Sequence, residues 1–354
     1  MTTCMERIMR NKIILASGCA LALTMATGGV LQAGEKEDME AMQKALNKQV
    51  IEGPSNPGNK AEMDVYRAQA LKNGALQPHL EGKLRAPIDQ EVGGPLSDVD
   101  TTLPKFAAIP RPSDVALVIG IEKYQKLVPA QYARADAEQV ANYLRQLGYA
   151  PRNVEVLLNE RATHTAVRLA LEQWLPEHVR ADSRVLVYYS GHGSINPATG
   201  ETYLVPHDGD PSYLASTAYS TKMLYAKLGE LKARQVVVTL DSCFSGQGGR
   251  SVMMEGARPA VAKIDDPALA SSNLAVLAAA EGTQISASSK ERRHGLLTYH
   301  FLKALQEGKQ DLASIYEYVN PKVQDDAKLQ NVAQSPSLRP GLERGRKFVL
   351  WDKQ

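Results

Sequence analysis

Short apolar runs alternate with amphipathic stretches from Val115 to the end of the chain. Continuous apolar runs of this length are typical of strands buried on both faces, and the helical spacing between them indicates crossover helices. The expected strands are residues 115–119, 154–158, 185–189, 236–240 and 274–280, with a closing strand at 347–351. The expected helices lie near residues 132–147, 167–174, 223–231, 295–307 and 311–328. This alternation predicts an α/β fold in which helices cover both faces of a parallel sheet.

Residues 1–33 have the pattern of an export signal. Three basic residues precede an uncharged, mainly apolar stretch at 13–31, and Ala33 is a small residue at a suitable cleavage position. We therefore expect an exported protein, periplasmic or secreted. The alternative is a membrane anchor at residues 13–31, because these 19 uncharged residues approach the length of a membrane span. A lipoprotein signal at Cys19 is less well supported, because its apolar lead-in is short.

The next segment, residues 34–112, differs from the rest of the chain. It is rich in Pro, Gly and charge, and helical spacing occurs only near 34–52 and 60–72. We interpret it as a helical and linker N-terminal extension with little core of its own. Residues 113–354 are then the single main domain.

Composition limits the possible partners. The 354 residues carry 41 Lys and Arg against 39 Asp and Glu, for a formal net charge of +2. This balance gives no electrostatic reason to expect nucleic acid, and an aromatic content of 6% disfavours a platform for stacking bases. Removal of the signal would leave Cys243 as the single cysteine, so an intramolecular disulfide is excluded in the mature chain.

Two reactive side chains follow two of the expected strands. His192 comes after the strand at 185–189, and Cys243 comes after the strand at 236–240. Because neighbouring parallel strands lie only ~5 Å apart and end at one edge, these side chains should meet there. An imidazole can take the proton of a thiol, so the pair predicts nucleophilic catalysis. The N–H groups of Gly193 and Cys243 are candidates for an oxyanion hole.

Metal chemistry is not expected at this site, because no His/Cys pair has zinc-ligand spacing. The acidic loop His207–Asp210 is a candidate calcium site, but it lacks the full ligand series of a calcium loop, and a solvated turn is the plainer interpretation. The other histidines, including His294 and His300, are expected to be structural.

Two motifs resemble those of a known family. Tyr189-Ser-Gly-His192-Gly-Ser and Asp241-Ser-Cys243-Phe-Ser-Gly each end an apolar strand, and the His and Cys are about 50 residues apart. They resemble the caspase-like cysteine peptidases, and most closely the bacterial metacaspase-type members. The resemblance spans about residues 115–351. It implies a caspase-like fold with a mostly parallel six-stranded sheet and helices on both faces.

The resemblance also implies roles for individual residues. Cys243 would be the nucleophile that forms a thioester acyl-enzyme, and His192 would be the general base and acid. Metacaspases select Arg or Lys before the scissile bond, and their two acidic pocket residues correspond to Asp136 and Asp241. A carboxylate in the pocket complements such a cationic side chain. The structural alternatives are a strand-end turn or cap for Asp241 and a first-turn helix charge for Asp136.

The family uses no metal in catalysis, although calcium activates some members. The expected partners are peptide or protein substrates with Arg or Lys before the cut bond. A membrane is expected as a partner only if the N-terminal segment stays uncleaved.

The loop after Cys243 is a candidate for self-cleavage. Related enzymes are cut there, and this loop carries Arg250, Arg258 and Lys263 in a stretch expected to be exposed. The alternative to an enzyme is a non-catalytic caspase-like module that binds a peptide or partner. Retention of both His192 and Cys243 counts against that alternative.

Overall fold

The computed structural model describes residues 96–244, 250–252, 273–280 and 284–354. The expected signal and the two expected helices before residue 73 lie outside the described residues, so they stay predictions. The described residues belong to one compact unit, Gly94–Gln354. Within these ranges, no helix is both long and apolar enough to span a bilayer.

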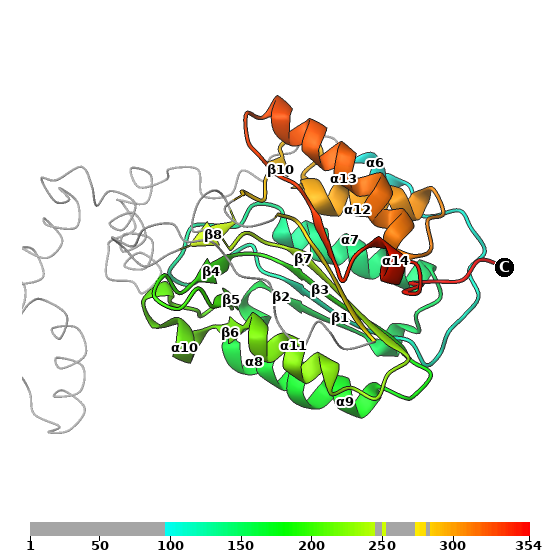
Figure 1. Ribbon diagram of the computed structural model, residues 1–354, viewed down its shortest axis with the longest axis horizontal. Coiled ribbons are helices and arrows are strands. Elements are labelled where there is room, and N and C mark those ends of the chain that lie inside the picture. The colour runs from blue at the N-terminus through cyan, green and yellow to red at the C-terminus, as the bar shows by residue number, and fades with distance from the viewer. Residues whose placement is uncertain (1–95, 245–249, 253–272, 281–283) are drawn as a thin grey trace, which may run out of the picture. The chain divides into compact units, whose positions relative to one another are not determined.

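A six-stranded sheet forms the centre of this unit (Figure 1). Its strand order is β12-β9-β7-β3-β1-β2. The edge strand β12 runs antiparallel to β9, and every other neighbouring pair is parallel. The strands are β1 Val115–Gly120, β2 Val154–Leu158, β3 Arg184–Ser190, β7 Gln235–Asp241, β9 Leu274–Ala278 and β12 Ser337–Arg339. The expected mostly parallel six-stranded sheet is therefore confirmed.

Helices cover both faces of the sheet. On one face lie α7 Ala133–Gln146, α12 Leu296–Gln306 and α13 Leu312–Leu329 (Figure 1). On the other lie α11 Thr221–Gly229 and a continuous helical stretch made of α8 His164–Leu169, the π-helical η5 Ala170–Trp174 and α9 Leu175–His178. The smaller helices are α6 Asp98–Thr101, η3 Pro151–Asn153, η4 Asn159–Arg161, η6 Pro211–Tyr213, α10 Leu214–Thr217 and α14 Leu342–Gly345.

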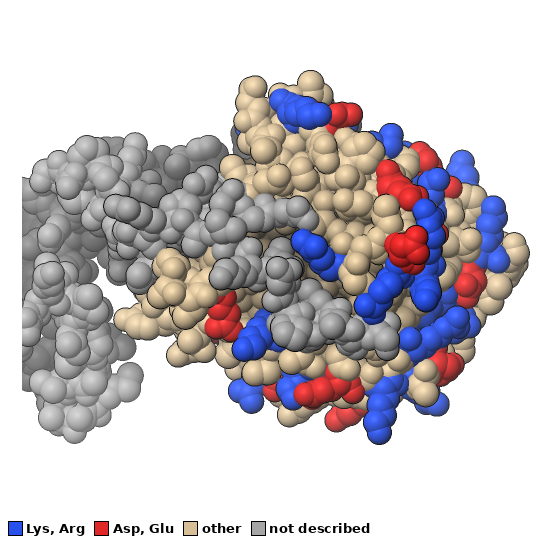
Figure 2. Space-filling model, viewed as in Figure 1, with Lys and Arg blue, Asp and Glu red and all other residues tan. Residues whose placement is uncertain are grey.

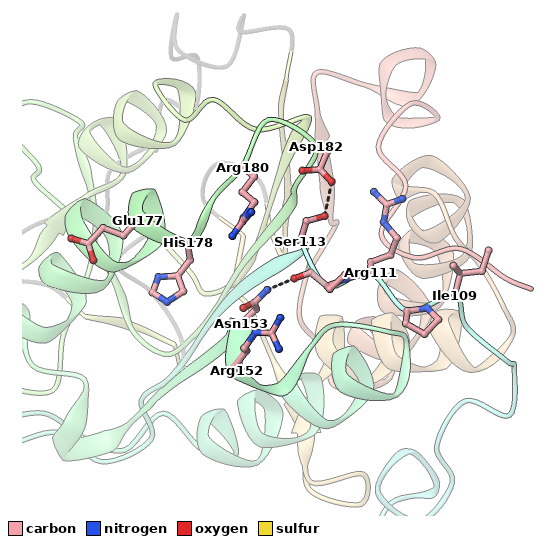
Figure 3. A pocket seen from close by; sticks show the side chains of 11 residues that line it. Ile109, Arg111, Ser113, Arg152, Asn153, Glu177, His178, Arg180 and Asp182 are labelled. Carbon is pink, nitrogen blue, oxygen red and sulfur yellow. Dashed lines mark hydrogen bonds between the residues drawn. The ribbon is translucent and has the colours of Figure 1, made fainter.

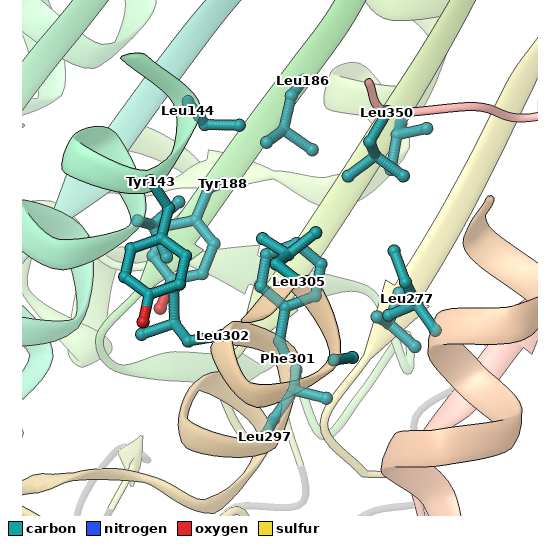
Figure 4. Close-up of a cluster of buried hydrophobic side chains, with 14 of the residues drawn as sticks. Tyr143, Leu144, Leu186, Tyr188, Leu277, Leu297, Phe301, Leu302, Leu305 and Leu350 are labelled. Atoms are coloured by element: carbon teal, nitrogen blue, oxygen red, sulfur yellow. The ribbon is translucent and has the colours of Figure 1, made fainter. Parts of the chain in front are cut away.

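Alternate residues of each strand face opposite helical layers. In β1, Val118 belongs to the core cluster under α7 and α12, whereas Leu117 belongs to the cluster under α8 and α11. Figure 4 shows the first cluster, whose labelled side chains include Tyr143 of α7, Leu186 of β3 and Phe301 of α12. Because both faces are covered, every residue of β1 is buried, and the strand is a continuous apolar run in the sequence.

Short strands at the carboxyl end of the main sheet were not expected from the sequence. One small sheet has the order β6-β5-β4-β8. Its strands are β4 Gly193–Ile195, β5 Thr202–Leu204, β6 Tyr219–Ser220 and β8 Ser251–Val252. A two-stranded ribbon is formed by β10 Ser288–Ser289 and β11 His294–Gly295.

The closing strand expected at residues 347–351 is wrong. Of these residues, Val349 forms one isolated antiparallel bridge with Asp311. Phe348, Leu350 and Trp351 of this run are nevertheless buried, and they pack in the core cluster under α12. The sixth strand is β12, which has a single apolar residue, Leu338, and therefore gave no apolar run to detect.

Residues 96–112 pack against the main domain. Val99 of α6 is fully buried. Its carbonyl accepts hydrogen bonds from Gln139 Nε2 at 2.6 Å and from the Tyr143 hydroxyl at 2.9 Å, both on α7. This part of the expected extension therefore shares the core of the domain that follows it.

Charges of both signs are interspersed on the described surface. In Figure 2, Lys and Arg side chains lie beside Asp and Glu side chains, mainly over the right and lower parts of the visible face. One such pair joins Arg346 to Glu317 of α13 at 2.7 Å. This mixing agrees with the near-zero net charge of the sequence.

Candidate active site

The tips of two neighbouring strands carry the predicted His and Cys. Strands β3 and β7 pair in parallel, with Ser190 opposite Asp241 at their carboxyl ends. His192 and Cys243 each follow two residues later, so the register places them at the same level of the sheet edge. The expectation that these strands are neighbours is confirmed. Continuous apolar strands explain the arrangement, because each remains buried up to the residue where the polar motif begins.

His192 is held in an orientation that leaves one ring nitrogen available. Its Nε2 lies 2.7 Å from the carbonyl oxygen of Val128, and since a carbonyl can only accept, Nε2 carries a hydrogen. Nδ1 has no hydrogen-bond partner among the described residues. The Tyr124 hydroxyl accepts the His192 backbone N–H at 2.7 Å, and its ring lies 4.7 Å from the imidazole.

The surroundings of His192 favour the neutral imidazole. Burial lowers its pKa, and the positive charge of Arg250 adds to this effect, whereas the backbone carbonyls of Val128 and Arg250 oppose it. A neutral ring with hydrogen on Nε2 has its lone pair on Nδ1. His192 can therefore accept a proton at Nδ1.

Cys243 is almost completely buried, at 1% exposed. Its Sγ donates a hydrogen bond to the carbonyl oxygen of Gln284 at 3.0 Å. The structure thus describes the protonated thiol, in which the proton must leave before Sγ can attack.

Two backbone N–H groups beside the thiol converge on one oxygen. The N–H of Gly193 donates to the Arg250 carbonyl at 3.0 Å, and the N–H of Cys243 donates to the same oxygen at 3.3 Å. These are the two groups that we expect to form an oxyanion hole. Such a pair of preorganised donors is the arrangement that stabilises negative charge on a carbonyl oxygen.

The close approach of these backbones depends on a glycine. A Cβ atom at Gly193 would lie 2.7 Å from Ser242 Oγ and 2.7 Å from the Phe244 ring. Both distances are shorter than a van der Waals contact, so a side chain at this position would separate the two strand tips.

Arg250 fills a buried polar recess next to these donors and is 2% exposed. Its Nη2 lies 2.7 Å from Asp136 Oδ2, and its Nη1 lies 3.0 Å from Asp241 Oδ1. The same guanidinium donates to Ser190 Oγ at 2.8 Å and to the Gln131 carbonyl at 3.0 Å. The two carboxylates raise its pKa against the opposing effect of burial. The recess therefore holds a cationic side chain through several directed contacts.

Asp136 lies in the first turn of α7 and is fully buried. Besides Arg250, it accepts hydrogen bonds from Ser190 Oγ at 2.9 Å and from the Gly295 N–H at 3.1 Å. Burial alone would raise its pKa, but the charges of Arg250 and His294 lower it overall. Asp136 does lie in the first turn of a helix, as the structural alternative expected. Its side chain, however, contacts the residues of the recess.

Asp241 ends β7 and contacts two neighbouring elements. Its Oδ1 accepts from Ser286 Oγ at 2.8 Å, and its Oδ2 accepts from the Thr298 N–H at 3.1 Å. Because Thr298 is in the first turn of α12, Asp241 also caps that helix. The cap interpretation and the contact with Arg250 therefore both hold.

His294, expected to be structural, contacts the same cluster. Its Nδ1 lies 2.8 Å from Asp136 Oδ1 and its Nε2 lies 3.0 Å from Asp100 Oδ1. Burial alone would lower the pKa of His294, but these two carboxylates raise it to about 9. At neutral pH the imidazolium therefore fixes one of the two recess carboxylates.

Some of these partners could be predicted from the residue pattern and others could not. Ser190 belongs to the motif around His192, so a motif signal existed for it, whereas His294 and Thr298 lie outside both motifs. The Val128 carbonyl is a backbone group and leaves no signal in the residue type.

The expectation of an exposed basic loop is wrong for Arg250, because its side chain is buried between two carboxylates. Arg258 and Lys263 lie outside the described residues.

In the acidic loop considered for calcium, the carboxylates of Asp208 and Asp210 already have partners within the protein. Asp208 accepts the His164 backbone N–H at 2.7 Å at the start of α8, and Asp210 pairs with Lys126 at 2.9 Å. Across the described ranges, His, Cys, Asp and Glu form no group of three or more that could hold a metal. These residues therefore do not fit a calcium site.

A separate open pocket lies at the opposite end of the sheet (Figure 3). It is lined by residues just before β1, β2 and β3, including Ser113, Asn153 and Asp182. Ser113 donates to Asp182 at 2.8 Å, and Asn153 donates to the Pro112 carbonyl at 2.7 Å. Because the His and Cys follow the carboxyl ends of the strands, this pocket is not part of their site.

Comparisons with known proteins place the chain among relatives. Residues 113–344 match the family described as Caspase domain. A solved structure of a protein from Geobacter sulfurreducens is 18% identical, with a TM-score of 0.47, over 68% of this chain and 100% of that one. Caspase-1 from Spodoptera frugiperda is 15% identical, with a TM-score of 0.48, over 72% of this chain and 94% of that one. No curated protein sequence matches.

Proposed function

The chain belongs to the caspase domain family, and from this premise we propose that it is a cysteine endopeptidase that hydrolyses peptide bonds after Arg or Lys. Cys243 is the nucleophile and His192 the proton shuttle. Gly193 and Cys243 supply the oxyanion donors, and Asp136 and Asp241 select the basic side chain.

The first step moves a proton from the Cys243 thiol to Nδ1 of His192, the nitrogen without a partner among the described residues. The hydrogen bond from Nε2 to the Val128 carbonyl keeps the ring oriented and stabilises the imidazolium that forms. The lowered pKa of His192 keeps the ring neutral, and so able to act as a base, around neutral pH.

The thiolate then attacks the carbonyl carbon of the substrate. Negative charge on the carbonyl oxygen is stabilised by the N–H groups of Gly193 and Cys243, and each such donor is typically worth about 3 kcal/mol of barrier. His192 gives its proton to the leaving amine, which leaves a thioester on Cys243. Water, activated by His192, hydrolyses the thioester and restores the thiol.

One observation carries the preference for basic residues. The guanidinium of Arg250 lies between Asp136 and Asp241 while the carbonyl of the same residue accepts from both candidate oxyanion donors. A single residue thus meets the two requirements of the residue before a cut bond. Without Arg250, two buried carboxylates would face one imidazolium, and this negative excess favours a cationic side chain.

Substitution of a recess carboxylate tests the proposed function. We expect Asp241→Asn to lower kcat/KM for peptides with Arg or Lys before the cut bond by about 100-fold, because it removes about 3 kcal/mol of charge pairing. Asn retains an acceptor for the Thr298 N–H, so the cap of α12 should survive. The measurement is hydrolysis of matched fluorogenic peptides that differ only in Arg, Lys or Asp at that position.

The control is Asp325→Asn, which changes an exposed carboxylate on α13. It should behave as the wild type. Unchanged Arg and Lys hydrolysis in folded Asp241→Asn protein would remove the pocket assignment, and hydrolysis that survives Cys243→Ala would end the proposal of a cysteine peptidase.

A non-catalytic peptide-binding module is the second candidate, favoured by the nearly complete burial of His192 and Cys243. The two candidates differ in turnover. A binding module would hold basic peptides without hydrolysing them, so peptide binding without product formation would support it.

Export is part of the same proposal. Residues 1–33 carry the signal pattern, so the protein is proposed to act in the periplasm or outside the cell, or at a membrane through residues 13–31. N-terminal sequencing of the protein from its native host would distinguish a cleaved signal from an anchor.

A further inference from the structure

The open pocket at the amino end of the sheet (Figure 3) has a cavity volume of about 740 Å³, a size typical of sites for small molecules. Three arginines line it, and each precedes a different parallel strand: Arg111 before β1, Arg152 before β2 and Arg180 before β3. Strand β1 lies between the other two in the sheet. Because neighbouring strands are only ~5 Å apart, three guanidinium groups from distant parts of the chain gather at this pocket.

These guanidinium groups have few partners within the protein. Among the described residues, the side chains of Arg152 and Arg180 form no ion pair and no hydrogen bond. The Nε of Arg111 lies 3.7 Å from Asp114 Oδ2 and has no hydrogen-bond partner in the described part of the chain. That carboxylate is already paired with Arg184 at 2.8 Å. The positive charge at the pocket is therefore largely uncompensated by the residues that the structure describes.

Two carboxylates also line the pocket, but they do not balance the three arginines. Asp182 accepts a hydrogen bond from the Ser113 hydroxyl at 2.8 Å. That hydrogen bond, together with the positive charges of Arg111 and Arg180, lowers the pKa of Asp182. Glu177 is exposed on α9, and Figure 3 shows its carboxylate pointing away from the arginines. The remaining positive charge attracts anions to the pocket.

The three segments that carry the arginines are fixed to one another. Asn153 Nδ2 donates to the Pro112 carbonyl at 2.7 Å, which joins the segment before β2 to the segment before β1. Ser183 Oγ donates to the Ser113 carbonyl and accepts the Arg180 backbone N–H at 2.9 Å, which joins the segment before β3 to the same place. Because the backbone is held in this way, only the arginine side chains must be ordered when an anion binds.

We propose that this pocket binds a small molecule with at least two linked phosphate groups, held by Arg111, Arg152 and Arg180. Each guanidinium can donate two parallel hydrogen bonds to one phosphate group. A single phosphate or carboxylate can pair with one or two of these arginines, whereas a chain of phosphates can reach all three. The inference goes beyond the proposed function and does not depend on it, because the pocket and Cys243 lie at opposite ends of the sheet.

The pocket also has an apolar side. Ile109, which is 41% exposed, lines it together with Pro110 and Pro112. Free polyphosphate and a nucleotide share the phosphate chemistry, but only a nucleotide has an organic body that could cover these residues. The experiment therefore compares the two kinds of ligand.

Calorimetric titration of the full chain, at fixed ionic strength and without divalent cations, measures the dissociation constants of three probes. They are inorganic triphosphate, adenosine triphosphate and citrate, which carries several negative charges on carboxylates. We expect both phosphate probes to bind at one site per chain, about tenfold more tightly than citrate. Tighter binding of adenosine triphosphate would identify an organic phosphate as the ligand, and tighter binding of inorganic triphosphate would identify a free polyphosphate.

Two substitutions test the assigned residues. Arg152→Gln and Arg180→Gln should each raise the dissociation constant of triphosphate about tenfold, because each removes one charge-assisted pair. Arg180→Lys keeps the charge without the planar fork and should recover part of the loss. Both arginines are exposed, so the variants should fold, and unfolding curves without ligand check this. The matched control is Arg161→Gln, which removes the same charge from an exposed arginine beyond the other end of β2 and should bind as the wild type does.

The outcomes decide the inference. Phosphate-selective binding that the two pocket variants weaken and Arg161→Gln does not would support it. Absence of binding by both phosphate probes would overturn it, and so would citrate binding as tight as that of triphosphate. Unchanged binding in folded Arg152→Gln and Arg180→Gln chains would put the phosphates elsewhere on the protein, and an equal loss in Arg161→Gln would reduce the effect to net charge. Either result would contradict the assigned site.

Discussion

Individual charges in the recess depend on one another. Asp136 contacts Arg250 on one side and His294 on the other, and His294 continues to Asp100 of α6. A buried carboxylate is stable only when its charge is compensated, and here two cations share that role. His294 is therefore a positioning residue, since it keeps Asp136 charged and oriented whether or not a basic side chain is bound.

This arrangement predicts a pH-dependent contribution to stability. The pKa of His294 is raised from 6.5 to about 9, so its protonated form stabilises the folded state. That contribution should be fully present below pH 6.5 and should be lost as the pH rises through about 9. We expect His294→Gln to lower the free energy of unfolding by about 2 kcal/mol at the acidic end of this window, and by less at the alkaline end.

The measurement is denaturant unfolding of both proteins across this range of pH. His178→Gln is the matched control, because the Nδ1 of His178 contacts a backbone carbonyl, that of Trp174, at 2.8 Å. The His178→Gln protein provides the baseline against which the pH dependence of the His294→Gln difference is judged. A difference for His294→Gln that stays constant across the window would show that the imidazolium does not stabilise the fold.

The sequence predicted the residue types of the site better than their connections. Asp136, His192 and Cys243 lie where motif and spacing placed them, and the roles assigned to them remain predictions. Arg250 was expected to be exposed, because a charged residue in a Gly-rich loop is usually solvated. Its burial depends on the nearby Asp241 and also on Asp136, which is far away in the sequence, and no local pattern reports the contact with Asp136.

At the scale of elements, the ends of β3 and β7 are the important feature. Their register brings Gly193 against the backbone of residues 242–243, so that two N–H groups point at the same oxygen. The geometry tolerates no side chain at position 193, because a Cβ atom there would lie 2.7 Å from Phe244.

We therefore predict that Gly193→Ala abolishes most activity and lowers stability by about 1–3 kcal/mol, the usual cost of overpacking. The matched control is Gly200→Ala. A Cβ atom at Gly200 meets nothing within 4 Å, but its φ of +75° makes a side chain strained. That variant should lose about 1 kcal/mol of stability and keep its activity. Equal activities of the two variants, measured on the Arg peptide, would contradict the close approach at position 193.

The long buried strands were predictable because helices cover both faces of the sheet and make each strand an apolar run. The short strands β4 and β8 were not, because two or three residues carry too little pattern to detect. The run at 347–351 was wrongly predicted as a strand because it is apolar. Its apolar residues pack in the core, but the run forms one isolated bridge, at Val349, and no strand. An apolar run indicates that its residues are buried, but it does not show whether they form a strand or an irregular segment.

At the scale of the whole molecule, the segment before residue 113 is tied to the site. Val99 is buried under α7, and the next residue, Asp100, contacts His294. The family match begins at residue 113, yet the packed domain includes residues 96–112. The N-terminal side of the domain therefore supports the recess from outside the matched region.

We expect Val99→Ala to lower the free energy of unfolding by about 2 kcal/mol, as for other truncations of buried aliphatic side chains. Leu96→Ala is the matched control, because Leu96 is 63% exposed and should contribute little. Denaturant unfolding of the full chain measures both. Equal stabilities of the two variants would mean that this segment does not belong to the folded core.

The most direct test of the central claim is covalent labelling of the full chain by two matched peptidyl chloromethyl ketones, one ending in Arg and one in Asp. A thiol activated by His192 beside an anionic recess should be alkylated at Cys243, and far faster by the Arg reagent, with the modified residue located by peptide mass spectrometry. Equal rates for the two reagents, or labelling that spares Cys243, would contradict the account.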